Sequence, residues 1–84
     1  MNLIYSSRAK DELAKIDWRL REDIITKLDY TMSSNDPIQF MTQLQNENLY
    51  KIEANKYVTV GRIVNDNFSI VSILPKQTIK LPTI

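Results

Sequence analysis

The sequence predicts one α+β domain spanning residues 1–84, in which two amphipathic helices pack against a C-terminal antiparallel β-meander. Two observations carry this prediction. After a short apolar run, two segments repeat apolar residues at helical spacing, and from residue 49 the apolar period changes to two. A chain of 84 residues forms a single domain with a thin core, because a chain this short buries only about 60–65% of its unfolded surface.

The first expected elements are a short strand and a helix. The apolar run Asn2–Tyr5 predicts the strand, and Ser6 or Ser7 then offers a hydroxyl that accepts from the free N–H groups of a first helical turn. The segment Arg8–Ile16 predicts the helix. Its apolar face comprises Ala9, Leu13 and Ile16.

A second helix is expected to start at Trp18, with Asp17 as its N-cap. Its apolar residues recur every four positions, at Leu20, Ile24, Leu28 and Met32. Two helices joined by almost no loop predict an antiparallel hairpin, with Trp18 packed at its corner. The polar turn and proline of Ser33–Pro37 end the helix, and residues 38–48 lack a clean period, which indicates a short helical turn or a packed linker.

Three strands rich in β-branched residues are expected at residues 49–53, 57–64 and 68–74. Asn55–Lys56 and Asn65–Asn67 supply the turns, because Asn and Asp tolerate positive φ. Gly61 predicts a bulge or close packing by a helix. Pro75 interrupts the last strand, and Gln77–Leu81 predicts a weak fourth strand at the edge.

Composition excludes several function classes. The chain has no Cys and no His, which argues against a disulfide framework, a zinc or redox-metal site and His-based acid–base catalysis. No carboxylate cluster indicates Mg²⁺, and no cofactor is expected. No apolar run approaches the roughly 20 residues that cross a bilayer. Because Met1–Ser7 lacks the charged and apolar regions of a signal peptide, we expect a cytoplasmic location without membrane contact.

Charge is distributed unevenly along the chain. Residues 1–49 carry six Lys and Arg against eight Asp and Glu, a net charge of −2, whereas residues 50–84 carry five against two, a net charge of +3. This asymmetry predicts a basic face on the C-terminal half, with an ordinary solvated surface as the alternative.

Five segments resemble, in their order and spacing, the RelE/ParE superfamily of toxins from bacterial toxin–antitoxin operons. Ala9–Asp17 is similar to the family's "A-x-x-x-L-x-K-L" helix, and Leu20–Leu28 to its "V-R-x-x-I-x-x-K-L" helix. Asn35–Pro37 stands where the family has "N-P". Leu49–Ile52 matches the "Y-R/K-I" strand, and Tyr57 starts the strand that usually reads "Y-R-V-I-Y-x-I".

The resemblance implies a partner and two alternative targets. RelE-like members cut mRNA in the ribosomal A site, whereas ParE-like members inhibit DNA gyrase without nuclease chemistry. Both are neutralised by an antitoxin whose extended C-terminal segment wraps the toxin. An exposed apolar surface or strand edge near Asn2–Tyr5 or the C-terminal strands is expected to receive it. A binding relic that has lost its active groups, and an unrelated small adaptor, are further alternatives.

Cleavage of RNA requires activation of the 2′-hydroxyl, compensation of phosphate charge and protonation of the leaving oxygen. Without His, these roles fall to Lys, Arg and Tyr. Lys51 matches a basic position of the resembling nucleases, and Arg62 and Lys76 are the candidates that replace missing groups. The expected RNA- or target-binding residues are Lys56, Tyr57 and Lys80. Ordinary solvated or packing roles are the alternatives for all six.

The chain departs from the nuclease pattern at two positions. Glu53 and Val58 stand where the resembling nucleases carry basic residues, and the C-terminal segment has no tyrosine. We therefore expect weak or absent mRNA cleavage. Alternation places Arg62 on the same sheet face as Val58 and Val60, so that its availability depends on whether the helices cover that face.

Overall fold

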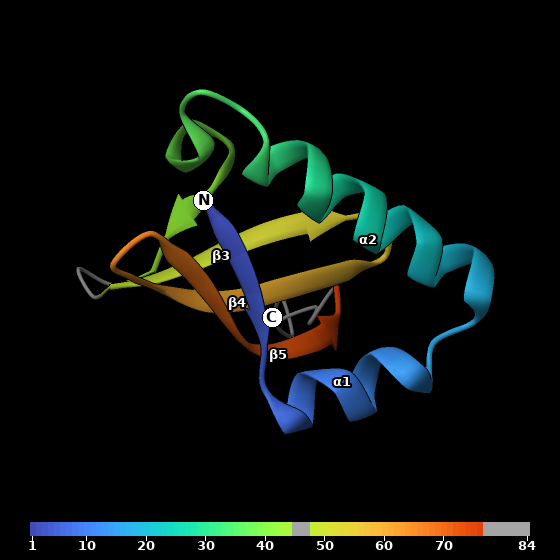
Figure 1. The fold of residues 1–84 in the computed structure, drawn as a ribbon. Coiled ribbons are helices and arrows are strands. Elements are labelled where there is room, and N and C mark those ends of the chain that lie inside the picture. Colours follow the sequence, from blue (N-terminus) through green and yellow to red (C-terminus); the bar gives the residue numbers. More distant parts are fainter. Residues whose placement is uncertain (45–47, 77–84) are drawn as a thin grey trace, which may run out of the picture.

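A five-stranded sheet forms the centre of the molecule (Figure 1). The computed structural model describes residues 1–44 and 48–76. In sheet order the strands are β1 (Asn2–Tyr5), β5 (Asn67–Pro75), β4 (Tyr57–Val64), β3 (Leu49–Ala54) and β2 (Thr42–Gln43). β1 runs parallel to β5, and every other neighbouring pair is antiparallel. The parallel pairing of β1 brings the first strand beside the last described one.

Two helices lie on one face of this sheet (Figure 1). α1 (Ser7–Ala14) and α2 (Trp18–Met32) run in opposite directions and splay apart above the strands. A 3₁₀ helix, η1 (Pro37–Phe40), then leads into β2. The predicted class, with one strand, a helical hairpin and a C-terminal meander, is confirmed.

The core lies between the helices and the sheet. Most of the apolar stripe predicted from helical spacing faces the strands, and Ile24 and Leu28 are fully buried. Leu13 and Leu20 are half-buried against the same cluster. The buried apolar residues are Ala9, Ile16, Ile24, Leu28, Met32, Ile52, Ala54, Phe68, Ile70 and Ile73. Helix-on-sheet packing therefore supplies most of the apolar burial.

Local chemistry fixes the helix ends. Ser6 is the N-cap of α1, where its Oγ accepts a hydrogen bond from the N–H of Ala9 at 3.0 Å. At the other end of α1, Nη2 of Arg21 donates to the carbonyl of Ile16 at 3.0 Å. Asp17 occupies the N-cap position of α2 as predicted, but its carboxylate makes no capping hydrogen bond.

The two hairpins follow the predicted turns. Asn55 and Asn65 each adopt φ of 57°, a conformation that asparagine tolerates better than most residues. The predicted bulge at Gly61 is also confirmed, since the register between β4 and β5 shifts between Val60 and Gly61. A Cβ at Gly61 would stand 2.8 Å from Cζ of Phe68, so the close packing comes from β5 and not from a helix.

Trp18 contradicts the prediction that it packs at the helical corner. Its side chain is 57% exposed, and the guanidinium of Arg19 lies 5.4 Å from its ring centre. At about 100° per residue, Trp18 projects about 200° around the helix from Leu20, which places it away from the apolar stripe. Among the described residues, no helix is long and apolar enough to cross a membrane. The strand predicted at Gln77–Leu81 lies outside the described residues.

Candidate functional site

The sheet face opposite the helices carries most of the predicted site residues. Alternation along β3 and β4 points Ile52 and Thr59 into the core and sends their neighbours to the other side. We call this side the outer face and define it by Lys51, Glu53, Val58, Val60, Arg62, Leu74 and Lys76. The exposed Arg62 therefore lies on the side that the helices leave open.

Glu53 holds two of the three cations for which a catalytic role is expected. Its Oε2 lies 3.1 Å from Nζ of Lys51, and its Oε1 lies 2.8 Å from Nζ of Lys76. Hydrogen bonds from Lys76 and Lys51, together with their positive charges, lower the pKa of the Glu53 carboxyl. The side chain of Lys51 is 31% exposed, that of Glu53 42% and that of Lys76 49%. Water and salt therefore screen both ion pairs.

Arg62 stands apart from that cluster but on the same face. In the sheet register Lys51 lies opposite Val60, two residues before Arg62. Such diagonal neighbours are about 7–8 Å apart, within reach of long side chains. No ion pair involves Arg62 among residues 1–44 and 48–76, in contrast to Lys51 and Lys76. Arg62 is thus the uncompensated cation of the outer face.

The remaining predicted site residues are spread more widely. Lys56 is exposed in the β3–β4 turn, where its carbonyl accepts from the N–H of Lys76, so these two lysines share one end of the sheet. Tyr57 is half-buried and packs against the core, because it points to the helix side. Lys80 lies outside the described residues. The structure therefore brings Lys51 and Lys76 together around Glu53, and it places Arg62 on the same face but further along β4. Tyr57 lies on the opposite side of the sheet.

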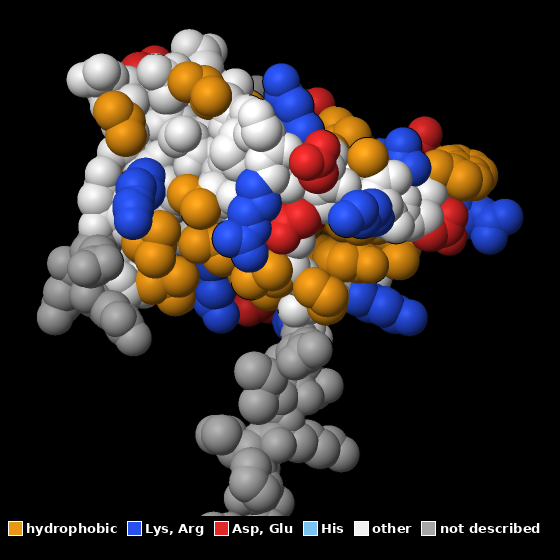
Figure 2. All heavy atoms as spheres, turned by 90° about the horizontal axis from the view of Figure 1, so that it is seen from below, with side chains coloured by type: hydrophobic (Ala, Val, Ile, Leu, Met, Phe, Trp, Pro, Cys, Tyr) orange, Lys and Arg blue, Asp and Glu red, His pale blue; other side chains and the backbone are white. Residues whose placement is uncertain are grey.

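Apolar side chains separate these charges on the outer face. Val58 lies between Glu53 on one side and Leu74 on the other across three adjacent strands. Leu74 is 41% exposed, and Val71 at the β5 bulge is 39% exposed. Figure 2 views the molecule from the side of α1 and shows hydrophobic side chains among Lys and Arg side chains on that side as well. The sequence had placed Val58 and Val60 on the face of Arg62, and the sheet register adds Leu74 of β5 beside Val58.

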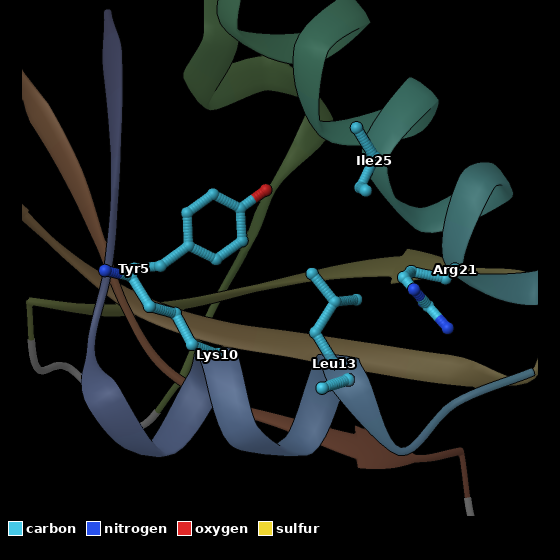
Figure 3. Close-up of a pocket in the computed structure, with 6 residues that line it drawn as sticks. Tyr5, Lys10, Leu13, Arg21 and Ile25 are labelled. Carbon is cyan, nitrogen blue, oxygen red and sulfur yellow. The ribbon is translucent and has the colours of Figure 1, made fainter. Parts of the chain in front are cut away.

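A second feature is an apolar groove of about 350 Å³ between α1 and α2 (Figure 3). Its lining residues are Tyr5, Lys10, Leu13, Ala14, Arg21 and Ile25. Burial, with the negative charge of Asp29, raises the pKa of Tyr5. Nε of Arg21 is buried without a hydrogen-bond partner in the described part of the chain. Sequence reasoning missed the groove because it arises from the splay of the two helices.

The chemistry available on the outer face is that of anion binding. Its Lys and Arg side chains donate hydrogen bonds to phosphate or carboxylate oxygens, and an arginine does so through two parallel N–H groups. Within the described ranges, no group of three or more Asp or Glu residues is placed to hold a metal ion. The ionisable groups on this face are the ammonium groups of Lys51 and Lys76, the guanidinium of Arg62 and the carboxylate of Glu53.

The sheet order and the helical pair on one face define a class of small α+β fold for which solved structures exist. The isolated E. coli RelE toxin matches with a TM-score of 0.76 and 21% identity over 90% of this chain and 84% of that one. The E. coli RelBE toxin–antitoxin complex matches with a TM-score of 0.73 and 21% identity, over 90% and 96% of the two chains. The RelB–RelE antitoxin–toxin complex from Methanococcus jannaschii matches with a TM-score of 0.71 and 15% identity, over 92% of this chain and 94% of that one.

The chain therefore has the RelE fold, and the resemblance drawn from its sequence is confirmed at the level of the fold. No family model matches the sequence, and no curated protein matches it either.

Proposed function

We propose that this chain is the toxin of a toxin–antitoxin pair and that it acts on translation by binding mRNA on the outer face of its sheet. The observation that carries this proposal is that Lys51, Arg62 and Lys76 share the sheet face opposite the helices. The RelE fold supports it, because the matched structures are a RelE toxin and RelB–RelE complexes. Such a target implies a cytoplasmic location.

The proposed chemistry is limited cleavage of the RNA backbone. Arg62 binds the non-bridging oxygens of a phosphate and offsets the charge that grows as the 2′-oxygen attacks phosphorus. A lysine ammonium donates a proton to the departing 5′-oxygen. No histidine is present, so solvent water accepts the proton that the 2′-hydroxyl loses as the 2′-oxygen bonds to phosphorus and the bond to the 5′-oxygen breaks. Glu53 also engages both lysines. The expected cleavage is therefore slow.

The proposed partner is a cognate antitoxin. Among residues 1–44 and 48–76, β1 forms one edge of the sheet and pairs with β5 alone, so that no described strand occupies its other side, which suits an added strand. Ile4 on β1 is 48% exposed and offers an apolar contact beside that edge. Co-purification with the product of an adjacent short reading frame tests the partnership. Ile4→Lys is expected to weaken that complex, whereas Ile38→Lys on η1 is the matched control.

Cell-free translation tests the toxin activity itself. Purified protein is expected to reduce synthesis of a reporter, and Arg62→Gln is expected to remove most of that inhibition. Lys27→Gln is the matched control, because Lys27 is exposed on α2, away from the outer face, and the change removes the same charge. Equal inhibition by wild type and Arg62→Gln would contradict a role for the outer face.

A second candidate is a non-catalytic toxin that binds a protein target such as DNA gyrase. The observation that favours it is the pairing of Lys51 and Lys76 with Glu53 beside the apolar Val58, which leaves Arg62 as the uncompensated cation. Such a mixed surface suits a protein partner better than a phosphate backbone. Growth arrest with normal translation, together with inhibited DNA supercoiling, would select this candidate.

A further inference from the structure

We propose that Glu53 occupies the anion site formed by Lys51 and Lys76 and acts as a built-in competitor of an RNA phosphate. This inference rests on the proposed RNA-binding role of the outer face. It assigns Glu53 an autoinhibitory role and identifies the ligand that Glu53 excludes as a phosphodiester.

The contact geometry supports a single site shared by two lysines. Each carboxylate oxygen of Glu53 contacts a different ammonium group. Oε2 lies 3.1 Å from Nζ of Lys51, and Oε1 lies 2.8 Å from Nζ of Lys76. The two non-bridging oxygens of a phosphodiester offer the same kind of acceptor pair to the same donors. Glu53 and a phosphate therefore compete for these two lysines, because the carboxylate occupies a donor of each ammonium, neutralises part of their charge and repels a second anion.

The fold holds the three groups together. Lys51 and Glu53 are two residues apart on β3, so alternation puts both on the outer face. Lys76 directly follows β5, and its N–H donates to the carbonyl of Lys56 in the β3–β4 turn. Val58 is the cross-strand neighbour of Glu53 on β4, so that strand supplies no further cation at this point.

The competitor is displaceable because all three side chains are partly exposed, by 31% to 49%. Exposed ion pairs are weak and are screened by salt, so Glu53 lowers phosphate affinity without closing the site. From the strength of such pairs we expect removal of the Glu53 charge to raise affinity about 3- to 10-fold at low salt. Each additional phosphate contact would also steepen the salt dependence by about 0.7 logarithmic units.

The test compares Glu53→Gln with Glu22→Gln, which removes the same charge from the exposed face of α2. Binding of a fluorescent single-stranded RNA oligonucleotide is measured by anisotropy at two salt concentrations. Glu53→Gln is expected to bind about 3- to 10-fold more tightly than wild type at low salt, and Glu22→Gln less than twofold more tightly. Equal gains in the two variants would overturn the inference, because they would reflect net charge alone.

Two further measurements separate this inference from the proposed function. Adding Lys76→Ala to Glu53→Gln is expected to abolish the gain in RNA affinity; a gain that persists would overturn the shared site. Inorganic phosphate is then titrated against the same variants by NMR. Tighter phosphate binding by Glu53→Gln, without RNA binding by any variant, would support the carboxylate competitor and contradict the proposed function. RNA binding by the wild type that depends on Arg62 but is unchanged by Glu53→Gln would support the proposed function and contradict the carboxylate competitor.

Discussion

The carboxylate of Glu12 on α1 accepts a hydrogen bond from the backbone N–H of Ile73 on β5 at 2.8 Å, across 61 residues of chain. The same Oε1 accepts from Oγ of Ser72 at 2.9 Å, and Nε of Arg8 donates to Oε2 at 3.3 Å. β1 pairs with β5 as far as Ile70, and beyond that point no strand of the described residues lies beside this edge of β5. Glu12 therefore satisfies part of a strand edge that would otherwise be open.

Glu12→Ala is expected to destabilise the fold by about 1–3 kcal/mol, the usual cost of losing hydrogen bonds to a charged group. Denaturant unfolding measures this difference in the free energy of unfolding. Asp11→Ala is the control, because Asp11 is the exposed neighbour on the same helix, and its removal is expected to change stability by less than about 0.5 kcal/mol. Similar changes in both variants would contradict a stabilising role for the hydrogen bonds of Glu12 to β5, because replacement by Ala improves helix propensity at both positions.

The Glu12 contact also predicts a pH dependence. Burial raises the pKa of this carboxyl, but the hydrogen bonds from Ile73, Ser72 and Arg8 outweigh it, so the folded-state pKa lies below its ordinary value of 4.5. A lowered pKa contributes stability that is present above the unfolded-state pKa and is lost as pH falls through the folded-state value. The stability difference between wild type and Glu12→Gln is therefore expected to be constant above about pH 5.5 and to shrink below pH 4.5. A difference that does not vary with pH would contradict this account.

Leu28 tests the packing of α2 on the sheet. Its side chain is fully buried, so Leu28→Ala is expected to cost about 2–5 kcal/mol, close to the whole stability of a small domain. Ile38→Ala is the control, since Ile38 is 47% exposed on η1. Thermal unfolding checks both variants. Equal thermal midpoints for Leu28→Ala and Ile38→Ala would contradict the packing of α2 on the sheet through Leu28.

Two substitutions restore the charges that the resembling nucleases carry at these positions. Val58 and Glu53 are cross-strand neighbours on the outer face, so Val58→Arg combined with Glu53→Lys creates a cationic cluster beside Lys51. We expect RNA affinity to rise by at least 10-fold at low salt, because added phosphate contacts each contribute to binding. Anisotropy with the RNA oligonucleotide measures it. Unchanged affinity would mean that RNA does not bind on this face.

Much of the fold was predictable because its signals are local. Helical spacing located α1 and α2, and the change to period two located β3, β4 and β5. Asn55 and Asn65 marked the two turns, because the required positive φ is a property of single residues. The parallel pairing of β1 with β5 joins segments more than 60 residues apart and leaves no local signal.

The orientation of β4 could not be derived from hydrophobicity. The strand turns Thr59 and Gly61 into the core and the apolar Val58 and Val60 to the outer face, the reverse of what polarity alone favours. Gly61 is required inside because the ring of Phe68 fills the space where a side chain would stand.

The candidate site was predictable only in part, because some of its contacts join segments that are far apart in the sequence. Lys51 followed from the family resemblance, and strand alternation placed Arg62 on the face of Val58 and Val60 without deciding whether the helices cover it. The pairing of Glu53 with Lys76 depends on how β5 ends beside the β3–β4 turn. The sequence reasoning treated Glu53 as a charge that repels RNA. The contacts with Lys51 and Lys76 add that its carboxylate also pairs with two of the cations proposed to bind RNA.

Primer extension on mRNA recovered from cell-free translation tests the central claim most directly. The wild-type protein is expected to produce weak, codon-positioned cuts, which Arg62→Gln removes and Glu53→Gln strengthens, with Lys27→Gln and Glu22→Gln unchanged as matched controls. Strong wild-type cuts that persist in Arg62→Gln, or an absence of cuts in both wild type and Glu53→Gln, would contradict an RNA-cleaving outer face restrained by Glu53.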